Sequence, residues 1–147
     1  MVSKIKTFVF SGVKAIDVNV EVKISSGIVA FNIVGLPDKA VNESKERVRS
    51  AINSMNLSFH AKRITINLTP ADIEKEGTFL DLPIAIGILE EMGVLPQDAV
   101  DDFVVMGELS LDGCINRVNG VLPATMAAGE RKLGIICPEE NGPEALW

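Results

Sequence analysis

The segment from Leu80 to Met92, LDLPIAIGILEEM, constrains the fold of this 147-residue chain more than any other. Its apolar residues are spaced so that they fall on nearly every side of a helix: Leu82, Ile84, Ala85, Ile86, Ile88 and Leu89. A helix that is apolar all round is a buried one, so we predict a central helix that other elements must cover. Pro83 fits its first turn, where a missing N–H matters least.

The first third of the chain supplies strands that could cover such a helix. In VNVEVKI, apolar residues alternate with Asn19, Glu21 and Lys23, and this period of two is typical of a half-exposed strand. The alternation predicts three strands paired as antiparallel neighbours, near Lys4–Phe10, Ile16–Ser25 and Val29–Val34. A further strand is predicted in KRITINLTP, where Pro70 ends it.

The remaining elements follow from helical spacing and turn residues. Asp38 can begin a helix whose apolar face includes Val48 and Ile52, and a second helix is predicted from about Val121 to Lys132. Asp112-Gly113 is a strong hairpin signal between two strands, and LGIICP is typical of a short buried strand. The order β-β-β-α-β-α-β-β-α-β predicts one α/β domain over residues 1–147: a two-layer sandwich with a mixed sheet and helices mainly on one face.

Composition is that of an ordinary globular domain, with 47% hydrophobic residues. No apolar run approaches the roughly 20 residues that cross a bilayer, and no secretory signal precedes the first strand. We therefore expect a cytoplasmic protein with no membrane contact. Cys114 and Cys137 form no metal-type pair, so both are expected to be reduced and buried. The apolar pair Leu146 and Trp147 suggests a chain that belongs to something longer.

Net charge is −6, and tyrosine is absent, which argues against a dedicated nucleic-acid surface. A local basic cluster remains as a possible contact for DNA or another partner: Lys45, Arg47, Arg49, Lys62 and Arg63. On a helix face such charges are most often just solvated.

Few residues are available for catalysis or metal binding. His60 is the sole histidine and is expected to be a surface residue in a connection. The nucleotide-binding patterns GxxxxGK[ST] and GxGxxG are absent, and no metal-type cluster occurs. The acid pairs are expected to be solvated: Glu90-Glu91, Asp101-Asp102 and Glu139-Glu140. Asp81 is less ordinary, because it enters an apolar helix either as a capping or first-turn acid or as a charge lining a pocket.

Three long segments carry a family resemblance: GLPDKAVNESKERVRSAI, ITINLTPADIEKEGTFLDLPIAIGIL and GELSLDGCINRVNGVLPA. Together they resemble the N-terminal domain of the magnesium-chelatase-like AAA+ ATPases of the ComM and YifB type. The resemblance implies that an AAA+ ATPase domain, with its ATP and Mg²⁺, follows this one, so that no cofactor is expected in this chain. It also implies a homohexameric, ATP-driven motor for DNA branch migration in natural transformation.

The same residues resemble, more distantly, the proteolytic domain of Lon protease, which uses a serine nucleophile and a lysine base. The serine position falls on Phe79 in KEGTFLD, and the lysine position falls on Leu122. Neither side chain can perform that chemistry, so the resemblance implies a pocket without catalytic residues: Lys75, Gly77, Thr78, Phe79, Asp81 and Leu122. Phe79 and Leu122 are expected to pack together or to fill the old pocket.

Three functions remain open at this stage. The first is a non-catalytic module that serves assembly, regulation or DNA engagement of the adjoining ATPase. The second is a residual Ser/Thr peptidase that uses Thr78, although no lysine occurs between Lys75 and Lys132 to serve it. The third is a dedicated DNA-binding domain that uses the basic cluster.

Overall fold

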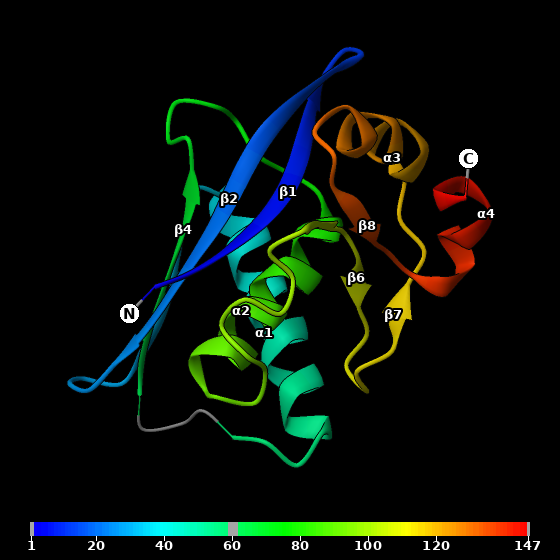
Figure 1. The fold of residues 1–147 in the computed structure, drawn as a ribbon. Helices are drawn as coiled ribbons and strands as arrows, with labels where there is room; N and C mark the ends of the chain where they lie inside the picture. The colour runs from blue at the N-terminus through cyan, green and yellow to red at the C-terminus, as the bar shows by residue number, and fades with distance from the viewer. Residues whose placement is uncertain (1, 59–61, 147) are drawn as a thin grey trace.

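The apolar segment forms the central helix α2, Asp81–Glu91, which packs across two strands of a six-stranded sheet (Figure 1). The structure is a computed structural model that describes residues 2–58 and 62–146. Every residue of α2 from Asp81 to Ile88 is buried, which confirms the prediction of a buried helix. A short 3-10 turn, Thr78–Leu80, leads into it.

The main sheet is mixed and has the strand order β3-β4-β2-β1-β5-β8. The long hairpin of β1 and β2 and the pair β2 and β4 are antiparallel, whereas the pairs β3–β4, β1–β5 and β5–β8 are parallel. The strands are β1 Ser3–Ser11, β2 Lys14–Ser25, β3 Ala30–Val34, β4 Arg63–Thr69, β5 Phe103–Val105 and β8 Gly134–Ile136. The prediction that β3 lies antiparallel beside its sequence neighbour β2 is wrong, because β4 is inserted between them.

The predicted hairpin at Asp112-Gly113 is present, but it stands apart from the main sheet. Its strands are β6, Glu108–Leu109, and β7, Ile115–Asn116. The strand predicted before the turn is two separate strands: β5 pairs within the main sheet, whereas β6 pairs only with β7. The Ser54 hydroxyl of α1 donates a 3.0 Å hydrogen bond to the Asp112 carbonyl oxygen and so holds the tip of the hairpin against the end of α1, Asp38–Ser54.

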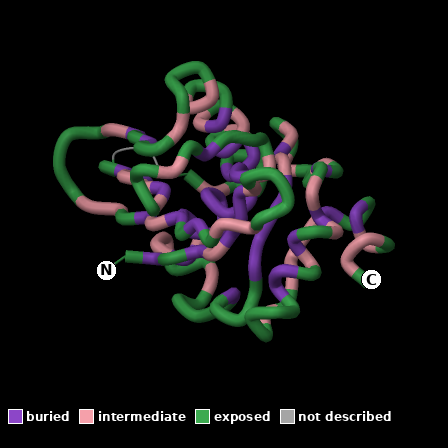
Figure 2. The backbone as a smooth tube through the Cα atoms, turned by 90° about the horizontal axis from the view of Figure 1, so that it is seen from above, coloured by how far each residue is buried: buried purple, intermediate pink, exposed green. Residues whose placement is uncertain are grey.

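The sheet carries apolar side chains on both faces, and each face has its own helices. Ile5 and Val105 belong to the larger core cluster, which includes α1 and α2. Their strand neighbours on the opposite face, Phe8 and Val104, belong to a second cluster with α3, Val121–Glu130. The predicted α/β fold with a mixed sheet is thus confirmed, with α1 and α2 on one face and α3 covering part of the other. Figure 2 shows the buried residues gathered in the middle of the molecule and the exposed ones in the peripheral loops.

Beyond α3 the chain contributes two short elements that the sequence pattern did not predict, a 3-10 turn at Glu139–Asn141 and helix α4, Gly142–Ala145. Asn141 is completely buried, and its side chain bonds both the N–H and the carbonyl oxygen of Val118 at 3.0 and 2.9 Å. This pairing satisfies backbone groups just before α3 and holds α4 beside that helix (Figure 1).

Helix α2 lies close against strand β2 at Gly87. A Cβ atom at this position would lie 2.4 Å from Cγ2 of Val22, so a larger residue fits only if the helix or the Val22 side chain shifts. Gly129 in α3 is the opposite case, because a Cβ there meets nothing within 4 Å. Alanine substitution at these two glycines therefore distinguishes the cost of overpacking from the gain in helix propensity.

We expect Gly87→Ala to destabilise the domain and Gly129→Ala to stabilise it. Overpacking at Gly87 costs about 1–3 kcal/mol, against a propensity gain of about 1 kcal/mol that both variants share. The free energy of unfolding from urea denaturation measures the difference. Equal changes in the two variants would contradict the close packing of α2 on β2.

Candidate functional site

The carboxylate of Asp81 lies at the meeting point of α1, α2 and β6. It is 1% exposed and accepts four hydrogen bonds. Arg47 donates two of them, from Nε at 2.5 Å and from Nη2 at 3.1 Å. The Ser44 hydroxyl donates at 2.8 Å, and the Leu109 N–H donates at 3.2 Å. All three elements are therefore joined through one buried anion.

Local sequence explains why these groups converge. Ser44 and Arg47 are three residues apart on α1 and so share a helix face. Asp81 is the first residue of α2, where the helix dipole favours a negative charge. It does not cap its own helix, because its oxygens are used by the neighbouring elements. The reading of Asp81 as a first-turn acid thus holds, whereas its carboxylate is directed into the interior and does not line the hollow in the adjoining surface.

Arg47, the ion-pair partner of Asp81, is partly exposed, with 22% of its side chain accessible. The hydrogen bond with Asp81 raises the pKa of Arg47 above its ordinary value, burial opposes this, and the charges of Asp81, Glu108 and Glu43 add to the rise. Glu43 lies 4.0 Å away at the edge, as the i,i+4 spacing predicts. The guanidinium fork and the buried carboxylate form a strong, geometrically specific pair.

Thr78 lies in the loop that the resemblance to Lon aligns with the nucleophile loop, one residue before Phe79. The Thr78 side chain is exposed, and its hydroxyl hydrogen-bonds to the carboxylate of Glu108 on β6. This bond, a second one from Asn116 and the charge of Arg47 hold the pKa of Glu108 below its ordinary value. A carboxylate with a lowered pKa is a weak base, so Glu108 is poorly suited to activate the hydroxyl.

Phe79 occupies the position where the resemblance to Lon places the nucleophile. It is half-buried and packs against both core clusters, so its ring joins the two apolar layers. A Cβ atom at Gly77, which has φ of 127°, would lie 2.4 Å from Cε1 of this ring. Only glycine therefore fits beneath Phe79. Leu122 is half-buried at the start of α3, and its direct contact with Phe79 stays a prediction.

Lys75 is the buried cation of the same loop, with 1% of its surface exposed. Its amine donates hydrogen bonds to the carbonyl oxygens of Pro70 and Ile73. Burial lowers the pKa of Lys75, and the charge of Asp72 partly offsets this. Gly35 leaves room for the side chain, since a Cβ there would lie 3.3 Å from Lys75 Cε. The amine serves to hold the loop in shape.

Beside Asp81 and Phe79, the surface is hollowed over about 570 Å³. Arg47, Thr78 and Phe79 line this hollow together with Glu43 and Asn119. The residues named from the resemblance to Lon are thus brought together in part: Thr78, Gly77 and Phe79 line the hollow, while Lys75 and Asp81 are buried and do not line it.

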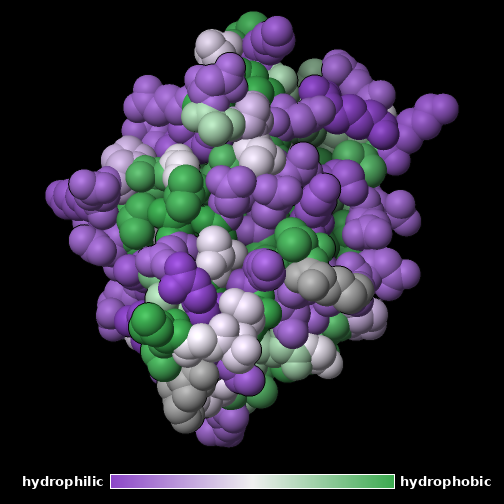
Figure 3. Space-filling view, turned by 90° about the vertical axis from the view of Figure 1, so that its left-hand side faces the viewer, coloured by the Kyte–Doolittle hydropathy of each residue, from purple (hydrophilic) through white to green (hydrophobic). Residues whose placement is uncertain are grey.

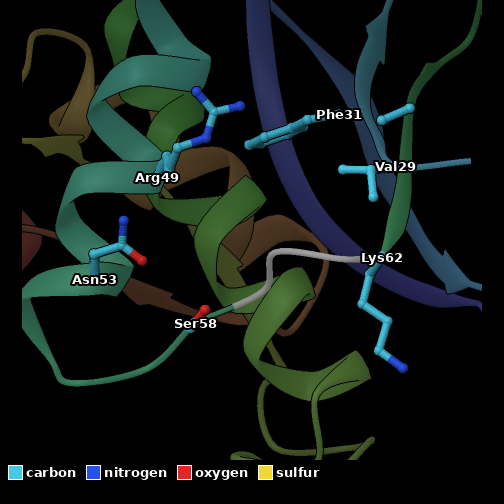
Figure 4. A pocket seen from close by; sticks show the side chains of 7 residues that line it. Val29, Phe31, Arg49, Asn53, Ser58 and Lys62 are labelled. Carbon is cyan, nitrogen blue, oxygen red and sulfur yellow. The ribbon is translucent and has the colours of Figure 1, made fainter.

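The basic cluster is only partly assembled. Arg49 and Lys62 line a second hollow of about 430 Å³ together with Phe31, Asn53 and Ser58 (Figure 4). Arg49 lies over the Phe31 ring, 5.5 Å from its centroid, and also pairs with Glu46 at 3.8 Å. In Figure 4 the Lys62 amine points away from the other side chains.

The other three basic residues lie elsewhere. Arg47 is engaged by Asp81. Lys45 is half-buried on α1. Arg63 precedes the buried Ile64 on β4, so the Arg63 side chain lies on the face of the sheet opposite to Ile64. Figure 3, which looks onto the left-hand side of Figure 1, shows a mostly hydrophilic surface with scattered apolar patches.

Two predictions about isolated residues are wrong, and one falls outside the described residues. Cys114 is exposed at the hairpin rather than buried, although Cys137 is half-buried as a free thiol. Glu90 is 2% exposed, so the pair Glu90-Glu91 is not simply solvated. His60 lies outside the described residues.

Sequence reasoning missed Ser44, Glu108 and Asn116 as site residues, because each is an ordinary polar residue until the fold brings it beside Asp81 or Thr78. Within residues 2–58 and 62–146, no group of three or more His, Cys, Asp or Glu side chains is placed to hold a metal ion. In the same ranges, no helix has the length and apolar character needed to cross a membrane.

Comparison with known proteins identifies related sequences over most of the chain. The family described as subunit ChlI of Mg-chelatase matches residues 20–141. Competence protein ComM of Haemophilus influenzae is 46% identical over 134 residues, which cover 91% of this chain and 26% of that protein. The uncharacterized protein YifB of Escherichia coli is 41% identical over 133 residues, which cover 90% of this chain and 26% of that protein.

A more distant relative supports the likeness to Lon. Lon protease 2 of Bacillus subtilis is 29% identical over 126 residues, which cover 79% of this chain and 22% of that protein. The chain spans about a quarter of the length of the curated relatives it matches.

We expect Asp81→Ala to destabilise the domain by about 3–5 kcal/mol, because it leaves Arg47, Ser44 and the Leu109 N–H without their buried partner. Glu43→Ala is the matched control, since it removes an exposed acid from the same guanidinium and should cost at most about 0.5 kcal/mol. Urea denaturation measures both. Similar losses in the two variants would show that Asp81 does not join the three elements.

Proposed function

The chain belongs to the family of the Mg-chelatase subunit ChlI, and on this premise we propose that it is a non-catalytic module of a longer AAA+ ATPase of the ComM and YifB type. In this proposal the module precedes the ATPase domain and serves its assembly, its regulation or its engagement of DNA. ATP and Mg²⁺ bind in the ATPase domain, and the intact protein forms a cytoplasmic homohexamer that drives DNA branch migration.

The proposed non-catalytic role rests on which residues occupy the loop that aligns with the nucleophile loop of Lon. By the resemblance to Lon, Phe79 stands at the nucleophile position and Leu122 at the base position, and Phe79 packs against both core clusters. The remaining polar groups are bound within the domain: Thr78 to Glu108, and Lys75 to two backbone carbonyls. A Ser-Lys dyad needs a partly neutral amine within reach of the hydroxyl. The Lys75 amine instead bonds the carbonyls of Pro70 and Ile73.

The proposal is tested in the intact gene product, with Thr78→Ala and a deletion of residues 1–147 compared side by side. Thr78→Ala should leave ATP hydrolysis and ring assembly unchanged, and neither it nor the wild type should cleave an unfolded protein substrate. The deletion should weaken ring assembly, as measured by light scattering, or change the rate of ATP hydrolysis. Substrate cleavage that is lost in Thr78→Ala would support the peptidase alternative.

DNA engagement is the second candidate, because Arg49 and Lys62 line one hollow beside Phe31. Two cations in one open hollow can contact a phosphate backbone, while the overall charge of −6 restricts such contact to a local patch. Arg47 is left out of this patch, since its guanidinium is occupied by Asp81.

We expect the double variant Arg49→Glu and Lys62→Glu to weaken DNA binding and to lower its salt dependence by about one or two released counterions. Lys132→Glu, a charge reversal at an exposed residue after α3, is the matched control. Binding to single and double strands is measured by fluorescence anisotropy at two salt concentrations. Equal losses in both variants would argue against a specific patch at Arg49 and Lys62.

A further inference from the structure

Glu90 is a buried acid that the proposed function does not use. It lies in the last turn of α2 and is 2% exposed. Neither of its carboxyl oxygens accepts a well-formed hydrogen bond from the described residues, although the Ser3 hydroxyl lies close enough to interact weakly with it. A buried carboxylate without donors is strongly disfavoured relative to a neutral carboxylic acid.

The donors around Glu90 are directed to other acceptors. The Ser3 hydroxyl, at the start of β1, donates to the Glu91 carboxylate at 2.8 Å. The Gln97 side-chain amide donates to the same carboxylate at 3.0 Å and to the Glu90 backbone carbonyl at 3.1 Å. Ser3, Glu91 and Gln97 thus connect β1, α2 and the following segment, with the Glu90 carboxyl enclosed among them.

The charges that face Glu90 are negative. Glu91 lies beside it on α2, and Asp98 and Asp101 face it from the segment after the helix. Lys6 on β1 places its amine 2.7 Å from the Asp101 carbonyl oxygen, at the exposed side of this corner. An ionised Glu90 would therefore add one more negative charge to three that are already present.

We propose that Glu90 is a proton-dependent latch: its neutral form holds the start of β1 and residues 92–101 against the end of α2, and its ionisation loosens them. The latch is a property of this domain itself and is independent of the ATPase that the proposed function places beside it. It rests on the burial of a carboxyl that lacks a well-formed hydrogen bond at the junction of three segments.

The electrostatics support this reading. Burial raises the pKa of Glu90 above its ordinary value, and the charges of Asp101, Glu91 and Asp98 raise it further. The nearby Ser3 hydroxyl opposes part of the rise. The folded domain therefore keeps the Glu90 proton over a pH range in which the unfolded chain has lost it.

The sign of the stability effect follows from this difference. Between the ordinary and the raised pKa of Glu90, the folded state binds one proton more than the unfolded state, so stability falls as pH rises. Above the raised pKa the destabilisation is complete and stays constant. Below the ordinary pKa, both states are protonated and the effect is absent.

Glu90→Gln tests the latch, because glutamine is a neutral side chain of the same shape. We expect wild type and Glu90→Gln to melt at similar temperatures at pH 4.5, and the variant to melt at least about 3 °C higher at pH 8. Glu140→Gln, at an exposed glutamate, is the matched control and should follow the wild type at every pH. A difference between Glu90→Gln and wild type that does not change with pH would overturn the proposal.

Hydrogen exchange locates the effect. At pH 8, the amides of residues 3–5 and 93–95 should exchange at least several-fold faster in wild type than in Glu90→Gln, with equal rates at about pH 4, below the ordinary pKa of a glutamate. An effect spread evenly over all strands would overturn the local latch. Should Glu90→Gln fail to fold, the side-chain carboxyl ¹³C shift of wild-type Glu90 decides: titration at the ordinary value of a glutamate would overturn the proposal, and titration at a higher pH would support it.

Discussion

The buried carboxylate of Asp81 is the interaction on which the arrangement of this domain depends. Because apolar side chains lie on nearly every side of α2, its hydrophobic pattern alone does not specify which side faces the sheet. The two parallel hydrogen bonds from Arg47 and the bond from Ser44 fix its position relative to α1. The Leu109 N–H then attaches the β6–β7 hairpin to the same point. We infer that the ion pair sets the geometry, while the apolar cores provide most of the stability.

Much of the fold could be predicted from periodicity, but strand neighbours could not. Alternation in β2 and all-round hydrophobicity in α2 report which faces are buried, and both were correctly predicted. The pattern of β3 would be the same beside β2 or beside β4, so its partner was not determined by its own residues. Likewise Arg47 and Lys45 look alike on a helix, and only the three-dimensional position of Asp81 distinguishes them. Contacts between residues distant in sequence were therefore the part that sequence patterns could not supply.

The loop before α2 is held in shape by contacts at both of its ends. The Phe79 ring over Gly77 and the Lys75 amine on two carbonyls stabilise the same turn from opposite ends. These contacts hold the loop through packing and backbone hydrogen bonds, which favour a rigid loop. A rigid, partly hollowed surface of this kind suits contact with another domain, as the proposed module requires.

Helix α2 carries two buried acids, and their environments differ in every respect that matters for charge. Asp81 lies at the amino end, where the dipole favours a negative charge and four donors surround it. Glu90 lies near the carboxyl end, where the dipole disfavours a negative charge and the neighbouring groups are acids. One end of the helix is therefore fixed by a charge, and the other is held only while a charge is absent. A single apolar helix thus combines a firm attachment to α1 and the hairpin with an attachment to β1 that depends on one proton.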